Sequence, residues 1–194
     1  TAHLRAFLPV EQIEALDRGV IVHRRYTLAS CQDGPQCHEV QAVRLGDVIR
    51  VELEIVAPNN LYYLQVEDPL PAGAEAIDTS LATTSVLAGG PVLQPPGGPM
   101  PIDGPVAVER GGAVAGGPAL DIYWPWWRWY SRSELRDEKV ALFADHLPRG
   151  AYLYSYTMRA TQAGEYRVIP TVASELYFPE VYGRADGQLL RVTK

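Results

Sequence analysis

Apolar and polar residues alternate with a period of two along several short segments of this chain. The clearest segment covers residues 48–57, in which Ile49, Val51, Leu53 and Ile55 alternate with Arg50, Glu52 and Glu54. This period places the apolar side chains on one face of a β-strand and the charged side chains on the other. Turn-forming residues bound the segment, with Gly46-Asp47 before it and Pro58-Asn59-Asn60 after it. We therefore predict a strand over residues 48–57, paired with a return strand over 62–67.

Similar alternation predicts further strands, at 20–28, 139–146, 152–160, 166–169 and 189–192. In the longest of these, the side chains of Tyr152, Tyr154, Tyr156, Met158 and Ala160 share one face. Residues 131–135 and residues 4–16, where Pro9 interrupts, are compatible with short helical turns. No long segment has the apolar period of 3.6 residues that a helical domain requires. About eight short strands separated by turns predict an all-β chain folded as an antiparallel β-sandwich.

Residues 87–130 have a different composition. Half of residues 87–118 are Gly or Pro, which excludes a regular helix or strand over that length. We expect an irregular insertion at 87–130 within a single sandwich domain that covers residues 19–194. Residues 1–18 are expected to be a linker or N-terminal lead-in to that domain.

The insertion ends in four tryptophans within six residues, Trp124, Trp126, Trp127 and Trp129. Exposed aromatic rows stack on sugar rings in many carbohydrate-binding modules, so this cluster is a possible aromatic contact surface. The alternative that we favour is that the rings pack against the sandwich, because large aromatic residues are mostly buried. A third alternative is contact with a neighbouring domain, since Trp and Tyr often dominate interfaces.

Charge and composition exclude several classes of function. The net charge is −6 and the basic residues are scattered, which argues against a nucleic-acid partner. No apolar run approaches the roughly 20 residues that span a bilayer, so no transmembrane segment is expected in this fragment. The chain does not begin with Met, and we interpret it as part of a longer polypeptide.

Two cysteines, Cys31 and Cys37, flank a short segment that contains the turn signal Gly34-Pro35. A hairpin tip would bring the two sulfurs together, and we favour a disulfide over two free thiols. The short loop limits the expected stabilisation to about 2–3 kcal/mol, and a disulfide suits an oxidising compartment. A zinc site is disfavoured, since His38 follows Cys37 but no further Cys or His pair completes four ligands.

No catalytic motif accompanies these strands, so we expect neither an enzyme nor a cofactor or metal. The sequence has no Gly-x-Ser-x-Gly elbow, P-loop or His-Glu-x-x-His motif. Asp145 and His146 are adjacent on a strand and should face opposite ways, which argues against a dyad. The carboxylate pairs Glu67-Asp68 and Asp137-Glu138 are interpreted as solvated strand ends.

An apolar segment interrupts the pattern near the end of the chain. Residues 170–183 are expected to form a loop that carries Leu176, Tyr177, Phe178 and Tyr182 around Pro179. This is more apolar bulk than a solvent-facing loop needs. From the residues alone, Leu176 and Tyr177 could equally cap the core of their own domain.

Three segments in the same order resemble one family. They are Gly19-Val-Ile-Val-His-Arg-Arg-Tyr26, Val66-Glu-Asp-Pro-Leu-Pro-Ala-Gly-Ala-Glu75, and the stretch from Leu135 to Arg184. Together they resemble the C-terminal macroglobulin-like domain, MG10, of a bacterial alpha-2-macroglobulin. The resemblance implies an antiparallel β-sandwich of the macroglobulin-like type, in which the Gly/Pro-rich insertion is tolerated.

The resemblance also implies a function, which is that of a non-catalytic domain in a broad-spectrum endopeptidase inhibitor. In the family, a Met-Tyr pair in the matching loop covers the thioester of the neighbouring domain. Leu176 and Tyr177 occupy those two positions, with Phe178 beside them, and Leu176 departs from the expected Met. The Cys-Gly-Glu-Gln thioester motif is absent from this chain. Implied partners are the thioester domain of the same parent chain and, through that parent, target proteases.

The implied location is periplasmic or extracellular, where any membrane anchor would belong to the parent chain. The alternative function is that of a carbohydrate-binding or structural β-sandwich module in a cell-surface protein. The tryptophan cluster would serve as the sugar-binding surface in the first case and would pack internally in the second.

Overall fold

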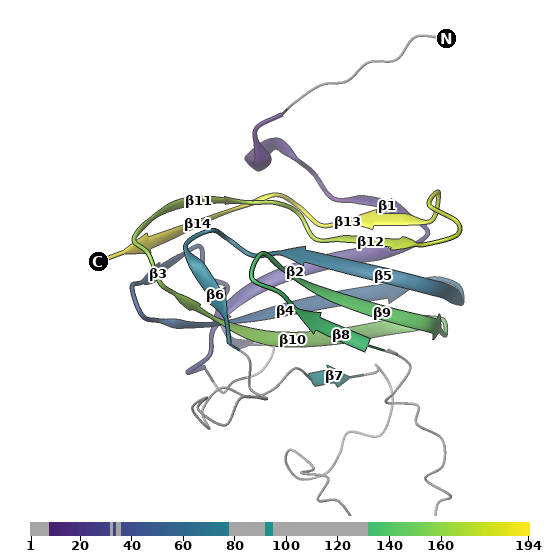
Figure 1. Cartoon of the computed structure of the whole chain (residues 1–194), viewed down its shortest axis with the longest axis horizontal. Helices are drawn as coiled ribbons and strands as arrows, with labels where there is room; N and C mark the ends of the chain where they lie inside the picture. The colour runs from purple at the N-terminus through teal and green to yellow at the C-terminus, as the bar shows by residue number, and fades with distance from the viewer. Residues whose placement is uncertain (1–7, 32, 34–35, 78–91, 95–131) are drawn as a thin grey trace, which may run out of the picture.

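The computed structural model describes residues 8–31, 33, 36–77, 92–94 and 132–194 (Figure 1). Within these ranges the chain is all-β, apart from one 3-10 turn at Val10–Gln12. The tryptophan cluster at 124–129 and most of the predicted insertion at 87–130 lie outside the described residues.

The strands form two large antiparallel sheets and one small sheet. The six-stranded sheet has the order β1-β13-β12-β5-β9-β8, with bounds Leu16–Arg18 (β1), Tyr182–Arg184 (β13), Val172–Glu175 (β12), Leu61–Pro69 (β5), Lys139–Leu147 (β9) and Arg132–Leu135 (β8). The five-stranded sheet has the order β2-β4-β10-β6, with β7 also paired to β10, and bounds Ile21–Leu28 (β2), Val48–Ala57 (β4), Gly150–Ala160 (β10), Ala74–Ala76 (β6) and Val92–Gln94 (β7). The small sheet has the order β11-β14-β3, with bounds Gly164–Val168 (β11), Gln188–Thr193 (β14) and Ala42–Arg44 (β3), and β3 is parallel to β14.

The core lies between the two large sheets. In Figure 1, β5, β8 and β9 lie in front of β2, β4 and β10. The alternating apolar residues of β4 are all buried, and Ile49 and Leu53 are fully enclosed. The tyrosines of β10 are buried on the same side of their sheet, together with Met158. Each enclosed aliphatic side chain contributes about 1.5–3 kcal/mol to folding, so the period of two seen in the sequence is what closes this sandwich.

The structure differs from the expected local structure at two places. Residues 132–135, which were compatible with a helical turn, form the edge strand β8, and the predicted loop at 170–183 contains strands β12 and β13. β8 reads Arg-Ser-Glu-Leu, and charged edge strands carry no alternating apolar signal. β12 has four residues, too few for a period of two to be recognised. In addition, residues 16–18 of the predicted lead-in form β1, which pairs with β13.

One buried ion pair joins the two large sheets, and it corrects the interpretation of Asp68 as a solvated strand end. Asp68 on β5 is fully buried, and its Oδ1 lies 2.8 Å from Nη1 of Arg24 on β2. The hydroxyls of Thr171 and Tyr156 donate to the same carboxylate at 2.7 and 2.6 Å. Arg24 also donates from Nη1 to the carbonyl of Ile169 at 2.9 Å. Buried charges need partners of this kind, and here they lock β2, β5, β10 and the segment leading into β12.

Candidate functional site

An exposed apolar loop connects β12 to β13. Its first three residues, Leu176, Tyr177 and Phe178, are 53%, 69% and 61% exposed, and we call them the finger loop. The loop is closed at its base, because the amide of Glu175 donates to the carbonyl of Val181 at 3.2 Å and the amide of Val181 donates to the carbonyl of Phe178 at 2.9 Å. The backbone therefore has a defined shape while its three apolar side chains stay in solvent. They do not cap the core of their own sandwich.

A second exposed aromatic group lies beside the finger loop, at the start of β5. Tyr62 and Tyr63 are 50% and 48% exposed, whereas Leu61 and Leu64 on either side of them are 3% and 2% exposed. We call Tyr62 and Tyr63 the tyrosine pair. The Tyr62 ring stacks on the ring of His146 at a centroid distance of 5.0 Å. His146 is exposed on β9, directly opposite Tyr62 in the sheet.

Three contacts join the finger loop and the end of β12 to the tyrosine pair. The amide of Leu176 donates to the carbonyl of Tyr63 at 3.0 Å. The amide of Tyr62 donates to Oε1 of Glu175 at 2.6 Å. The Tyr177 and Tyr63 rings meet edge to face at a centroid distance of 5.0 Å, a favoured geometry for aromatic pairs. Five exposed apolar or aromatic side chains, three from the finger loop and two from β5, thus form one continuous surface.

This surface lies at one end of the sandwich, where three connections meet. The β4–β5 turn, the β9–β10 turn and the β12–β13 loop all lie at the right-hand end in Figure 1. Asn60 and Arg149 tie two of these turns together, because the Arg149 amide donates to Asn60 Oδ1 at 2.9 Å. The small sheet of β3, β11 and β14 lies at the opposite end. The aromatic surface therefore projects from a braced end of the molecule.

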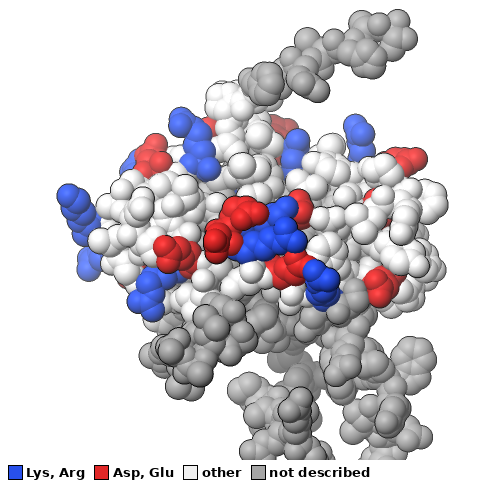
Figure 2. All heavy atoms as spheres, viewed as in Figure 1, with Lys and Arg blue, Asp and Glu red and all other residues white. Residues whose placement is uncertain are grey.

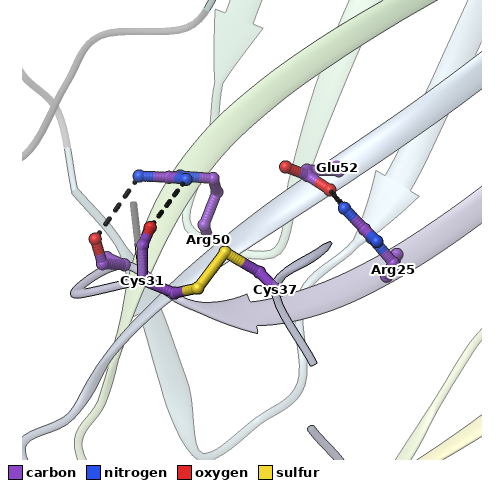
Figure 3. The surroundings of a disulfide bond; sticks show 6 residues. Arg25, Cys31, Cys37, Arg50 and Glu52 are labelled. Carbon is purple, nitrogen blue, oxygen red and sulfur yellow. Dashed lines mark hydrogen bonds and ion pairs between the residues drawn. A yellow bond between two sulfur atoms is a disulfide. The ribbon is translucent and has the colours of Figure 1, made fainter. Parts of the chain in front are cut away.

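The disulfide lies away from this surface. Cys31 and Cys37 are joined in the connection between β2 and β3, and Cys37 is buried (Figure 3). Arg50 on β4 donates to the carbonyls of Cys31 and Ala29 at 3.4 and 3.3 Å. On the same face of that sheet, Arg25 pairs with Glu52 across β2 and β4. These contacts fasten the β2–β3 connection to the sheet, which is a structural role.

Charged side chains of both signs lie on the face of the sandwich that Figure 2 shows. Among the described residues, no three His, Cys, Asp or Glu side chains gather as a metal site. Figure 2 shows blue and red side chains interspersed on the face of the six-stranded sheet, with no patch of one sign. Lys139 on β9 and Glu67 on β5 form an ion pair between these neighbouring strands at 2.7 Å. The tyrosines whose pKa is most raised, Tyr26 and Tyr156, are buried in the core. Burial raises the pKa of each, and the negative charge of Asp68 raises it further.

Asp145 and His146, which the sequence places on opposite faces of a strand, are both exposed. On β5, the neighbouring strand, the consecutive residues Tyr62 and Tyr63 are also both exposed, and Tyr62 lies opposite His146. The alternation of buried and exposed side chains is therefore interrupted at the same position in both strands. Sequence reasoning missed the tyrosine pair, although consecutive aromatic residues at a strand start, after a Pro-Asn-Asn turn, were a usable signal.

Comparison with known proteins identifies the family. The family model described as "Bacterial Alpha-2-macroglobulin MG10 domain" matches residues 19–180. The chain belongs to this MG10 family. The MG10 chain is 28% identical over 140 residues to an alpha-2-macroglobulin homolog from Nostoc sp., covering 72% of this chain and 6% of that protein. It is 24% identical over 148 residues to alpha-2-macroglobulin from Thermotoga maritima, covering 76% of this chain and 8% of that protein.

Solved structures share the fold of this MG10 chain. Native alpha-2-macroglobulin from Escherichia coli, spanning domain MG7 to the C-terminus, matches with a TM-score of 0.62 and 21% identity over 93% of this chain and 24% of that one. The same protein activated by porcine elastase matches with a TM-score of 0.65 and 18% identity, over 93% of this chain and 14% of that one. Salmonella alpha-2-macroglobulin reacted with methylamine matches with a TM-score of 0.60 and 20% identity, over 93% and 10%. The MG10 chain thus spans a small part of each of these relatives.

Proposed function

We propose that this MG10 domain shields a reactive thioester in the adjacent thioester domain of a parent alpha-2-macroglobulin. The observation that supports the proposal is the outward projection of Leu176, Tyr177 and Phe178, each more than half exposed. A folded domain gains little by leaving three large apolar side chains in water, and such patches mark contact surfaces. The side chains are held on a closed hairpin base, which is suited to docking without a large ordering cost.

The chemistry of a thioester accounts for an apolar cover. A thioester is an activated acyl group that water and amines attack, so excluding water from it slows its loss. Leucine replaces the methionine expected from the family at the first position of the pair, and the two side chains are similar in size and polarity. The MG10 domain itself supplies no thioester, because both of its cysteines are joined in the disulfide.

The wider role follows from the parent family and is part of the same proposal. In the parent, a protease would cut a bait segment, the domains would rearrange, and the uncovered thioester would bond to a lysine of the protease. The MG10 domain would act as a non-catalytic cover before cleavage. A periplasmic or extracellular location is consistent with the Cys31–Cys37 disulfide, since such compartments are oxidising. No helix among the described residues is long and apolar enough to cross a bilayer.

Replacing both finger residues in the parent tests this proposal. Leu176→Ala with Tyr177→Ala should accelerate loss of methylamine-reactive thioester about tenfold, the effect of losing contacts worth about 1.4 kcal/mol. The matched control is Leu45→Ala with Ile169→Ala, which trims two aliphatic side chains that are 49% and 62% exposed after strands of the small sheet. The control should match the wild type. Free thiol released over time gives the rate, and an unchanged rate in the finger variant would remove the shielding role.

A further inference from the structure

The backbone of Tyr63 is in an unusual conformation. Its φ is +52°, and among the described residues no other non-glycine residue has a positive φ. For a bulky L-residue this left-handed region costs roughly 1–2 kcal/mol, whereas glycine adopts it freely. Conformations of this kind persist where the surrounding structure holds them, and they concentrate at functional sites. The presence of tyrosine here therefore needs an explanation beyond the turn itself.

The left-handed residue changes which side chains of β5 face outward. In a regular strand, Leu61 and Leu64 would face opposite sides, yet both are buried. The break in alternation places Tyr62 and Tyr63 together in solvent. β9 follows the same pattern, because Leu147 and Ala144, which lie opposite Leu61 and Leu64, are buried. The strain at Tyr63 thus presents two adjacent aromatic rings on one exposed surface.

The Tyr63 ring itself contributes little to folding. It is 48% exposed, and among the described residues its ring contact is with Tyr177, which is itself 69% exposed. A glycine at this position would remove the backbone strain and would lose only this exposed contact. The stability of the sandwich therefore does not account for a tyrosine here, whereas recognition of a second surface does.

Glu175 fixes the position of the tyrosine pair relative to the finger loop. Glu175 is 6% exposed and ends β12, immediately before Leu176. Its carboxylate accepts the Tyr62 amide at 2.6 Å, and its own amide donates to Val181. A buried carboxylate is costly unless it is hydrogen-bonded, so these bonds secure the base of the finger loop to the start of β5. The two aromatic groups are held as one unit.

We infer that the tyrosine pair is the second half of the surface that docks on the neighbouring domain of the parent chain, with Glu175 as its positioning residue. This inference rests on the shielding role proposed for the finger loop. The occupant is taken to be a domain of the same polypeptide, because the chain spans only 6–8% of its full-length relatives. A stable interface buries about 800 Å² per partner, more than three finger residues cover, and tyrosine is enriched in such interfaces.

Tyr63→Gly in the parent separates docking from folding. It removes the ring while relaxing the backbone, so we expect an unchanged or higher melting temperature of this chain and about fivefold faster thioester loss in the parent. Tyr63→Asn, which also tolerates a left-handed conformation, should behave in the same way. A lower melting temperature with an unchanged thioester lifetime would instead assign Tyr63 a purely structural role and overturn the inference.

Hydroxyl-radical footprinting distinguishes failure of this inference from failure of the shielding role. We expect Tyr62 and Tyr63 to be several-fold less reactive in the native parent than in this chain alone. If the finger variant accelerates thioester loss but the tyrosine pair is equally reactive in both samples, the inference fails and the shielding role stands. If the tyrosines are protected but neither variant alters thioester loss, the docking surface stands and shielding fails.

Glu175 is tested by a graded pair of variants in the parent. Glu175→Ala removes the acceptor for the Tyr62 amide, so that amide should exchange its hydrogen faster in this chain and thioester loss should accelerate severalfold. Glu175→Gln retains an acceptor oxygen and should restore most of both properties. Equal behaviour of the two variants, or wild-type behaviour of Glu175→Ala, would remove the positioning role.

Discussion

At the scale of single residues, Arg24 and Asp68 hold the sandwich together through charge. Both side chains have no solvent exposure, and their atoms approach to 2.8 Å across the interface between the large sheets. Such a pair offsets its own desolvation only when both partners are present, and removing one leaves an uncompensated buried charge. The four elements that meet at Asp68 therefore depend on a single carboxylate.

We expect Asp68→Asn to lower the free energy of unfolding by about 3–5 kcal/mol, because the Arg24 guanidinium would stay buried without a counter-charge. Urea denaturation followed by far-ultraviolet circular dichroism measures the change. Glu67→Gln is the matched control, since Glu67 neighbours Asp68 but pairs with Lys139 at the surface, and it should cost less than about 1 kcal/mol. Equal losses in the two variants would contradict a special role for Asp68.

Sequence reasoning could not identify this pair, and the reason is physical. The alternation of residues 20–28 predicts inward side chains at Val20, Val22, Tyr26 and Leu28. The first three are buried, and Leu28 is partly buried against the core. Arg24 lies on the same face of the strand as these residues. Its charge nevertheless indicates an exposed side chain unless a buried partner is known. That partner is 44 positions away on another strand, and a single sequence does not report such a pairing.

At the scale of elements, long alternating strands were predictable and short or edge strands were not. β4 has the predicted bounds, and β9 and β10 lie where the apolar alternation indicates. β12 and β13 were predicted as a loop, because their pairing with β5 and β1 supplies the order that their own sequences do not specify. The excess of apolar residues at 176–178 was visible in the sequence, but its exposure depends on that hairpin.

The β2–β3 connection is an element whose order depends on a covalent bond. We expect Cys31→Ser with Cys37→Ser to lower the free energy of unfolding by about 2–3 kcal/mol. The reason is that the disulfide closes a short loop, and without it the unfolded chain gains conformational entropy. Chemical denaturation with and without reductant measures the effect. The double variant should be insensitive to reductant, and a wild-type midpoint that is also insensitive would contradict the prediction.

At the scale of the whole molecule, folding is coupled to pH through buried tyrosines. Burial raises the pKa of Tyr26 and of Tyr156 above the usual value near 10. Above about pH 10 the unfolded chain ionises these tyrosines, while the folded chain keeps them neutral. The unfolded state then binds fewer protons, so the free energy of unfolding is fully present below about pH 10 and falls as pH rises further.

Tyr26→Phe should reduce this alkaline loss, and denaturant midpoints between pH 8 and pH 11.5 would show the difference. The substitution preserves packing, because the Tyr26 hydroxyl is buried without a hydrogen-bond partner among the described residues. Arg24 lies over the Tyr26 ring at 5.4 Å, a contact that phenylalanine keeps. A variant that lost stability with the same steepness as the wild type would exclude Tyr26 as a source of the pH dependence.

The path by which the chain enters the sandwich bears on how the molecule responds to tension. β1 forms three residue pairs with β13, the strand that returns from the finger loop, and the Ala15 amide donates to Asp186 just beyond β13. A pull on the incoming polypeptide would load the contacts of residues 11–14, such as the Gly187 amide on the carbonyl of Ile13 at 2.9 Å, and then these pairs, before it reached the core. Separation of β1 would expose the edge of β13, while the Arg24–Asp68 ion pair would still join the two large sheets. We therefore expect the lead-in and β1 to detach under tension before the sandwich unfolds, which pulling on the N-terminus in a force spectrometer would show as a separate early step.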